Sequence, residues 1–297
     1  MFPTPQQQEH IQSHAIQTGV PHTNLGILRS TVVPVPSLAQ QKTIARILGS
    51  LADKIELNRR RNETLEAMAQ GLFESWFIDF DPVRAKAEGR DPGLPAPIAD
   101  LFPAHLIGSE LGEIPSGWSV GRLDDVIVLQ RGFDLPASSR ADGPYPVLAA
   151  SGPSGFHNEF MGRGPGVTTG RSGVLGNVFF VHDNFWPLNT SLWVKEFKHA
   201  TPAYAFHLLS SLDFGIFNAG SAVPTLNRNH IHNLPALLPA SALVETFDRA
   251  VTPMLRRQRC AEEESNFLAG LRDVLLPKLI SGELRVKDIK CLVKSGS

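Results

Sequence analysis

The sequence predicts an α+β protein that combines a loop-rich, partly β domain with two long, coiled-coil-like helices. Two observations lead to this fold class. The chain repeats a pattern at a separation of 203 residues, and residues 112–239 contain short β-type runs separated by Gly, Pro, Asn and Ser. Because an internal repeat defines the structural unit, it has to be considered before the individual elements are assigned.

The repeat consists of a short motif followed by a helix. Residues 20–36 and 223–239 both begin with Val-Pro and end at a proline, and each proline precedes apolar residues spaced alternately by four and three. This spacing is typical of a coiled-coil stripe. Both stripes are polar in the middle, at Asn58 and Asn62 in the first and at Gln258 and Ser265 in the second. We expect the helix seam to contain Ile44, Leu48, Leu51, Ile55, Leu65, Leu72, Trp76, Phe247, Val251, Met254, Leu268, Leu275 and Leu279.

The elements follow one another along the chain with clear changes of composition. Residues 1–36 match only the end of the longer β-type region, so they are expected to be the C-terminal remnant of an equivalent domain. Pro253 lies within the second helical pattern and predicts a kink, and the Pro- and Ala-rich residues 92–103 predict an extended segment. The expected divisions are a spacer helix over 37–80, a linker over 81–110, a β-containing domain over 111–239, a second helix over 240–282 and a tail over 283–297.

Composition limits the class of protein. The chain has 297 residues, of which 42% are hydrophobic and 19% charged, as expected for a globular protein of about two domains. It lacks a run of about 20 apolar residues and a secretory signal pattern, which predicts a cytoplasmic protein without membrane contact. Cys260 and Cys291 have no CxxC partner, so neither a disulfide framework nor a zinc site is indicated. The net charge of −1 requires any nucleic-acid binding to be local.

Four segments resemble a known family in their order and spacing. They are residues 34–41 (PVPSLAQQ), 72–86 (LFESWFIDFDPVRAK), 111–118 (LGEIPSGW) and 275–284 (LLPKLISGEL). Together they resemble the specificity subunit of type I restriction-modification systems. The resemblance implies two long helices that pack antiparallel beside a target-recognition domain over 111–239. Because only the end of a first recognition domain is present, the chain resembles an N-terminally truncated member.

The same resemblance implies a function in DNA recognition without catalysis. The chain would bind one half of a bipartite target and position its partners, as the specificity component of a type I site-specific deoxyribonuclease and adenine methyltransferase complex. The implied partners are double-stranded DNA, the methyltransferase (M) subunits, the restriction/motor (R) subunits and, for a one-domain form, a second copy of the chain. Base flipping, cofactor binding and ATP use would belong to the other subunits, so no cofactor is expected for this chain.

Two polar clusters are the main candidates for DNA contact. In residues 170–177 the glycines would let backbone amides and Arg171 approach a phosphate or a base edge. A glycine-rich hairpin with a solvated arginine is the alternative. The second cluster, around residues 218–229, is rich in Asn and Ser, which read bases but also cap turns. The DNA-binding candidates are Arg131, His157, Asn158, Arg163, Arg171, Asn177, Asn189, Ser221, Thr225, Asn227 and Arg228.

No catalytic or metal-ligating residues are predicted. Asp79, Asp81 and Lys86 could suggest a nuclease site, but they directly follow a helix, and a structural motif at the helix end is favoured. His230 and His232 would alternate between the faces of a strand and could not share a metal ion. A different class of function, a coiled-coil adaptor with a β-rich interaction module and no DNA role, is the main alternative. The eight basic and nine acidic residues between 111 and 239 are compatible with it.

Overall fold

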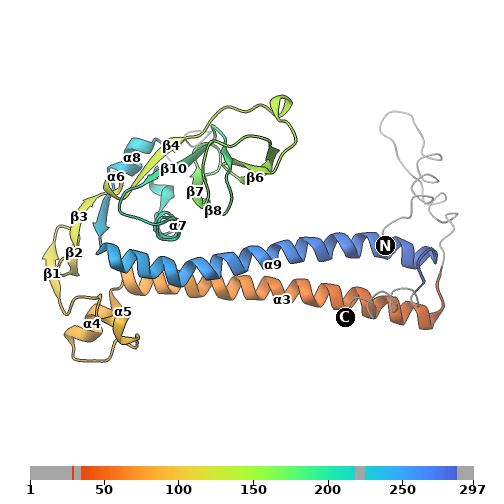
Figure 1. Ribbon diagram of the computed structural model, residues 1–297, viewed down its shortest axis with the longest axis horizontal. Coiled ribbons are helices and arrows are strands. Elements are labelled where there is room, and N and C mark those ends of the chain that lie inside the picture. The colour runs from red at the N-terminus through yellow and green to blue at the C-terminus, as the bar shows by residue number, and fades with distance from the viewer. Residues whose placement is uncertain (1–28, 30–34, 218–224, 286–297) are drawn as a thin grey trace. The chain divides into compact units, whose positions relative to one another are not determined.

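The computed structural model describes residue 29 and residues 35–217 and 225–285. The chain divides into two compact units, Met1–Thr64 with Arg257–Ser297, and Leu65–Arg256. The long helices α3 (Leu38–Phe77) and α9 (Ser241–Ser281) each contribute to both units (Figure 1). The Val-Pro motifs of the repeat lie outside the described residues.

The first unit contains a pair of antiparallel helical segments. The side-chain amide of Asn58 donates to the carbonyl oxygen of Ala261 (3.4 Å), whereas the amide of Asn62 donates to that of Gln258 (3.2 Å), so rising numbers on α3 meet falling numbers on α9. Ile44 and Leu279 are buried, and none of the seam residues is exposed. At the start of α3, Ser37 and Gln40 exchange hydrogen bonds as a capping box, which satisfies amides that lack intrahelical partners.

The core of the second unit is an aromatic cluster. Phe73 and Phe77 of α3, Tyr204 of α7 (Pro202–Ser210) and Phe247 of α9 are all buried. Phe77 packs edge-on against Tyr204 with a centroid distance of 4.9 Å and against Phe247 at 5.4 Å. Edge-to-face contacts of this kind add to the stabilisation that comes from burying the rings. The cluster therefore joins three helices that are distant in the sequence.

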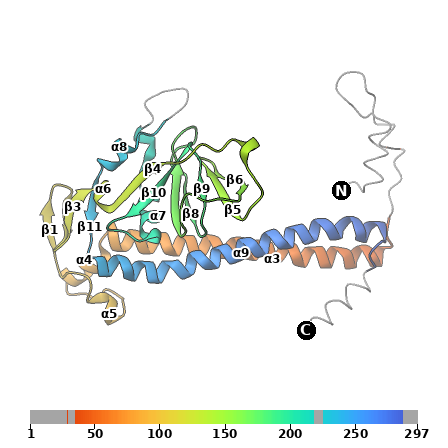
Figure 2. The ribbon, with the colours of Figure 1, turned by 45° about the horizontal axis from the view of Figure 1, so that its top comes forward.

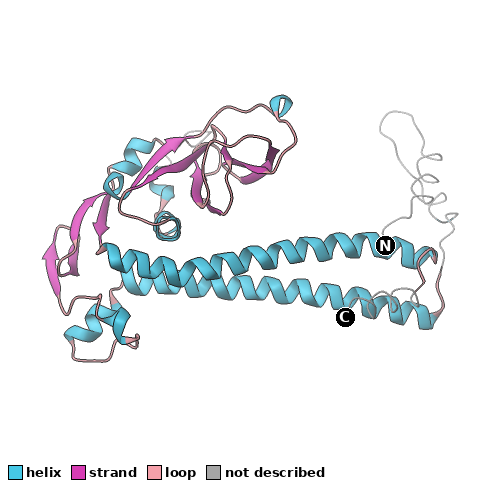
Figure 3. Cartoon of the chain, viewed as in Figure 1, coloured by secondary structure: helices cyan, strands magenta, loops and turns pink. Residues whose placement is uncertain are grey.

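The main sheet of the second unit has the order β4-β10-β7-β8, with every neighbouring pair antiparallel (Figure 2). Its strands are β4 (Ile127–Arg131), β10 (Ser191–Phe197), β7 (Gly166–Gly170) and β8 (Val178–Val181). A second sheet has the order β6-β5-β9, formed by Gly152–His157, Tyr145–Ala149 and Trp186–Pro187. These strands confirm the α+β fold class (Figure 3).

Shorter elements complete the second unit. Two small antiparallel sheets pair β1 (Leu106–Ser109) with β2 (Gly112–Pro115), and β11 (Pro235–Leu238) with β3 (Ser119–Arg122). Short helices are α4 (Asp81–Ala87), α5 (Ala96–Ala99), α6 (Leu123–Val126) and α8 (Arg228–His232), and 3₁₀ turns occur at Ala137–Ser139 and Phe214–Phe217.

Two local expectations differ from the structure. Residues 92–103 are not simply extended, because α5 forms within them and the buried Phe102 packs edge-on against Trp76 at 5.2 Å. Helix α9 contains both Pro253, where a kink is predicted, and Pro277, and it continues past each of them. His230 and His232 lie on α8 rather than on a strand, since Asn227 caps a helix that begins at the next residue.

Candidate nucleic-acid interface

One end of the main sheet gathers several of the predicted DNA-binding residues. Arg131 at the end of β4 is opposite Leu192 of β10, and Gly170 at the end of β7 is opposite Ser191. β8 begins beside that same end, because Val178 pairs with Thr169. The loops at this end contribute a set of residues that we call the sheet end: Arg131, Asp134, Arg171, Asn177, Asn189 and Thr225.

The turn Leu188–Ser191 holds these loops together. The backbone amides of Arg171 and Ser172 both donate to the carbonyl oxygen of Thr190, at 2.8 and 3.1 Å, and the amide of Asn189 donates to that of Phe133 at 2.9 Å. A side chain at Gly132 would place its Cβ 2.2 Å from the Leu188 carbonyl oxygen, so only glycine permits this close approach. The sheet end is therefore built by backbone contacts between segments about 20 to 55 residues apart.

Side-chain contacts orient the polar groups of the sheet end. The guanidinium of Arg171 donates to the backbone oxygen of Asn189 at 3.2 Å, and the side-chain amide of Asn189 donates to the carboxylate of Asp134. Thr225 lies opposite Ser172 in an isolated bridge, and the amide of Leu226 donates to the carbonyl oxygen of Arg171 at 2.8 Å. Thr225 of the second predicted cluster thus adjoins the first cluster, and Arg228 of the second cluster is the first residue of α8.

Two polar side chains position helix α8, one by capping it and the other by a hydrogen bond to β4. The side-chain oxygen of Asn227 accepts from the Asn229 amide at 3.0 Å, so Asn227 serves as the N-cap, which is the alternative role considered for this cluster. His232 Nε2 accepts from the Leu129 amide at 2.9 Å. Burial lowers the pKa of His232, which favours the neutral ring that this hydrogen bond requires.

Other predicted contacts lie away from the sheet end. His157 is only 6% exposed, and its Nδ1 accepts from the Ala141 amide at 3.2 Å, so its ring faces the interior. Asn158 and Arg163 lie between β6 and β7, at the opposite end of β7 from Arg171. Five strand residues separate these ends by roughly 13 Å. Ser221 lies outside the described residues. We therefore leave these four residues out of the proposed interface.

The sheet end carries more positive than negative side chains. Arg131 and Arg171 carry positive charge there, and Arg228 begins the adjoining helix, whereas Asp134 is the acidic member of the set. Asp134 is not among the DNA-binding residues predicted from the sequence, and only the hydrogen bond from Asn189 draws attention to it. No Lys or Arg occurs between residues 199 and 227. Positive charge is thus local, as the near-neutral net charge requires.

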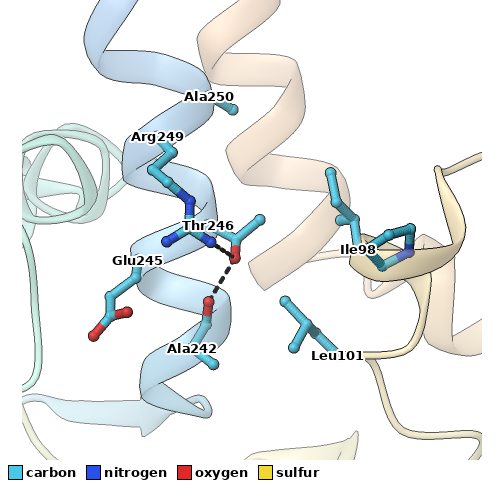
Figure 4. A pocket seen from close by; sticks show the side chains of 8 residues that line it. Ile98, Leu101, Ala242, Glu245, Thr246, Arg249 and Ala250 are labelled. Atoms are coloured by element: carbon cyan, nitrogen blue, oxygen red, sulfur yellow. Dashed lines mark hydrogen bonds between the residues drawn. The ribbon is translucent and has the colours of Figure 1, made fainter.

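The same unit also has a surface depression away from the sheet end. It has a volume of about 440 Å³ and lies between the α5 region, with Ile98 and Leu101, and the first turns of α9 (Figure 4). Arg249 donates to the Thr246 hydroxyl at 2.7 Å, and this hydroxyl donates to the Ala242 carbonyl oxygen at 2.7 Å. Because these polar groups satisfy one another, the cavity shows no array prepared for a polar ligand.

Neither a metal cluster nor a membrane span is found in the part of the chain that the structure describes. Within these ranges no three His, Cys, Asp or Glu side chains are placed to hold a metal ion, and no helix is both long and apolar enough to cross a bilayer. Lys86 donates to the backbone oxygen of Phe102 at 2.7 Å, and Asp81 is the first residue of α4. Lys86 therefore has a structural contact after the end of α3, and Asp81 lies at the start of the next helix.

Comparisons with known proteins agree with this architecture. Residues 6–67 match the family model described as the type I restriction modification DNA specificity domain. The MjaIX specificity subunit of Methanocaldococcus jannaschii is 24% identical and aligns with 97% of this chain and 69% of its own length. The HindI specificity subunit of Haemophilus influenzae is also 24% identical, over 89% of this chain and 71% of its own. A crystal structure of the S subunit from M. genitalium has the same fold, with a TM-score of 0.63, 17% identity and coverage of 92% and 70% of the two chains.

Proposed function

We infer that this chain, a specificity subunit of the type I restriction-modification family, reads one half of a bipartite DNA target through the sheet end of its second unit. The observation that supports this most directly is the position of Arg131 at the same end of the sheet as the turn that holds Arg171 and Asn189. Guanidinium groups contact phosphates and guanine, and amides contact adenine, so these side chains can both position and read a duplex.

The long helices suit a spacer in such a complex. At 1.5 Å per residue, the 40 residues of α3 extend over roughly 60 Å. Half-sites on one face of a duplex repeat every ~34 Å, so a helix of this length can separate two readers by a fixed number of base pairs. We propose that the exposed helix faces bind M subunits, that R subunits join through them, and that a second copy of the chain supplies the other reader. The complex would act in the cytoplasm.

The direct test is selection of DNA from a pool. The chain would be mixed with its cognate methyltransferase subunit and a pool of randomised duplexes, and bound DNA would be recovered and sequenced. Enrichment of a half-site, or of its inverted repeat with a constant gap, supports the proposal. A complex that forms without enriching any sequence would contradict DNA reading while leaving the spacer role intact.

A matched pair of arginine substitutions tests the location of the interface. Arg131→Ala removes a cation from the sheet end, whereas Arg163→Ala removes one from the opposite end of β7, and both side chains are exposed. We expect Arg131→Ala to weaken binding on all sequences and to reduce the slope of log K against log salt by about 1. Arg163→Ala should leave the slope unchanged. Equal effects of the two substitutions would show that the interface lies elsewhere.

A further inference from the structure

Asn189 is held in position from three directions at the sheet end. Its backbone amide donates to the carbonyl oxygen of Phe133 at 2.9 Å, and its backbone oxygen accepts from the Arg171 guanidinium at 3.2 Å. Its side-chain amide donates to the Asp134 carboxylate. A side chain restrained at both the backbone and the tip loses little freedom on binding, which is the condition for selective recognition.

The chemistry of Asp134 determines which way the Asn189 amide faces. An ionised carboxylate only accepts hydrogen bonds, so the amide nitrogen of Asn189 has to face it and the amide oxygen has to face away. One N–H of the amide is used in this contact, and one N–H and the oxygen remain. Across the described residues, no donor is bonded to that oxygen.

Asp134 has no other interaction among the described residues that would explain its position. It is exposed, and within the described ranges it forms no ion pair and no hydrogen bond except the one from Asn189. A carboxylate beside Arg131 and Arg171 reduces the attraction of the surface for phosphates. Its presence at the sheet end therefore requires a contribution that offsets this loss, and orientation of the neighbouring amide is such a contribution.

We propose that Asp134 is a positioning residue that holds the Asn189 amide in the orientation that reads adenine and rejects guanine. Adenine presents an acceptor at N7 and a donor at N6, which match the remaining N–H and oxygen of Asn189. Guanine presents two acceptors, N7 and O6, so the fixed amide oxygen would face an oxygen of the base. The inference rests on the proposed function, and it assigns one adenine of the half-site to this pair.

The test uses the same randomised duplex pool with the full chain and its methyltransferase partner. In Asp134→Asn the new side chain can donate or accept, so the Asn189 amide can turn over. We expect the wild type to prefer adenine over guanine at one position by roughly tenfold, and this preference to fall to near unity in the variant. Asn189→Ala should lose the preference at the same position, and Asp134→Glu, which still only accepts, should keep it.

Asp142→Asn serves as the charge control, since Asp142 is exposed on the same unit and is not a partner in the hydrogen bonds described for Asn189. This substitution should either raise the overall affinity for DNA or leave it unchanged, and it should not change the preference for any base. Thermal unfolding of each variant shows whether the fold is kept. An unchanged adenine preference in Asp134→Asn, or a preference lost at different positions in the Asp134 and Asn189 variants, would overturn this inference alone. A wild-type chain that enriches no sequence would overturn the proposed function, and this inference with it.

Discussion

His207 shows at the scale of one residue how burial changes side-chain chemistry. The ring is 5% exposed and lies among Phe73, Phe206 and Phe247, with centroid distances of 5.8, 5.0 and 5.7 Å. Its Nε2 is buried without a hydrogen-bond partner in the described structure. Burial lowers the pKa of His207 from 6.5 to about 4, because the charged ring would lose its hydration.

This shift predicts a loss of stability in mild acid. Between pH 6.5 and about 4 the unfolded chain binds a proton at His207 and the folded chain does not, so the free energy of unfolding falls as the pH falls. Above pH 6.5 this group does not affect the free energy of unfolding, and once the pH has fallen to about 4 and below it lowers that free energy by about 3 kcal/mol. Urea unfolding of the wild type and of His207→Leu from pH 7 to 4 measures it. The curve of the variant should be flatter, and parallel curves would contradict the prediction.

At the scale of elements, a polar layer fixes the pairing of α3 with α9 in the first unit. The amide of Asn58, which is 1% exposed, donates to the Glu264 carboxylate at 2.7 Å, and Lys54 pairs with the same carboxylate at 3.1 Å. Asn58 also donates to Ala261, its counterpart 203 residues later in the repeat. Equivalent positions of the two repeats therefore face each other at this point of the helix pair. Polar residues in a seam are a common means of setting register.

Removal of one amide should destabilise the helix pair. Asn58→Ala removes a buried amide that donates to Ala261 and Glu264 across the helix pair, and we expect the free energy of unfolding to fall by about 1 to 3 kcal/mol. Thr64→Ala, an exposed polar substitution on the same helix, should change it by no more than about 0.5 kcal/mol. Denaturant unfolding followed by circular dichroism measures both variants. Similar values for the two would argue against a structural role for the layer.

Two phenylalanines on α9 provide a second element-scale comparison. Phe247 is 0% exposed within the aromatic cluster, whereas Phe267 is 69% exposed. Phe247→Ala should cost about 3 to 5 kcal/mol because it leaves a cavity between three helices. Phe267→Ala should cost less than about 1 kcal/mol. The midpoints of thermal unfolding compare them directly, and a large loss for Phe267→Ala would show that its face is covered in solution.

The charge of the whole molecule sets the expected salt dependence of DNA binding. With a net charge of −1, the proposed binding would rely on the local cations Arg131, Arg171 and Arg228. Three phosphate contacts predict a slope of log K against log salt of about −3 for one chain on one half-site. Titrations between about 50 and 200 mM salt test this value. A slope steeper than about −6 would require a positive surface that these arginines do not provide.

The sequence by itself determined the helix stripes, the α+β class and the family resemblance. Helical periodicity is a local property, so the seam residues from Ile44 to Leu279 could be chosen without coordinates. The sequence also brought Arg131, Arg171 and Asn189 into the candidate set, because their side chains have the chemistry that reads DNA. It could not show that His157 is buried or that Asn227 caps a helix.

Only the tertiary structure decided which candidates share a surface. The pairing of β10 with β4 and β7 places Arg131, Arg171 and Asn189 at one end of the sheet and Arg163 at the other. Strand register and the loop contacts of Leu188–Ser191 depend on residues about 20 to 55 positions apart, and no local pattern specifies them. Asp134 belongs to the site for the same reason, since its role depends on an amide 55 residues away.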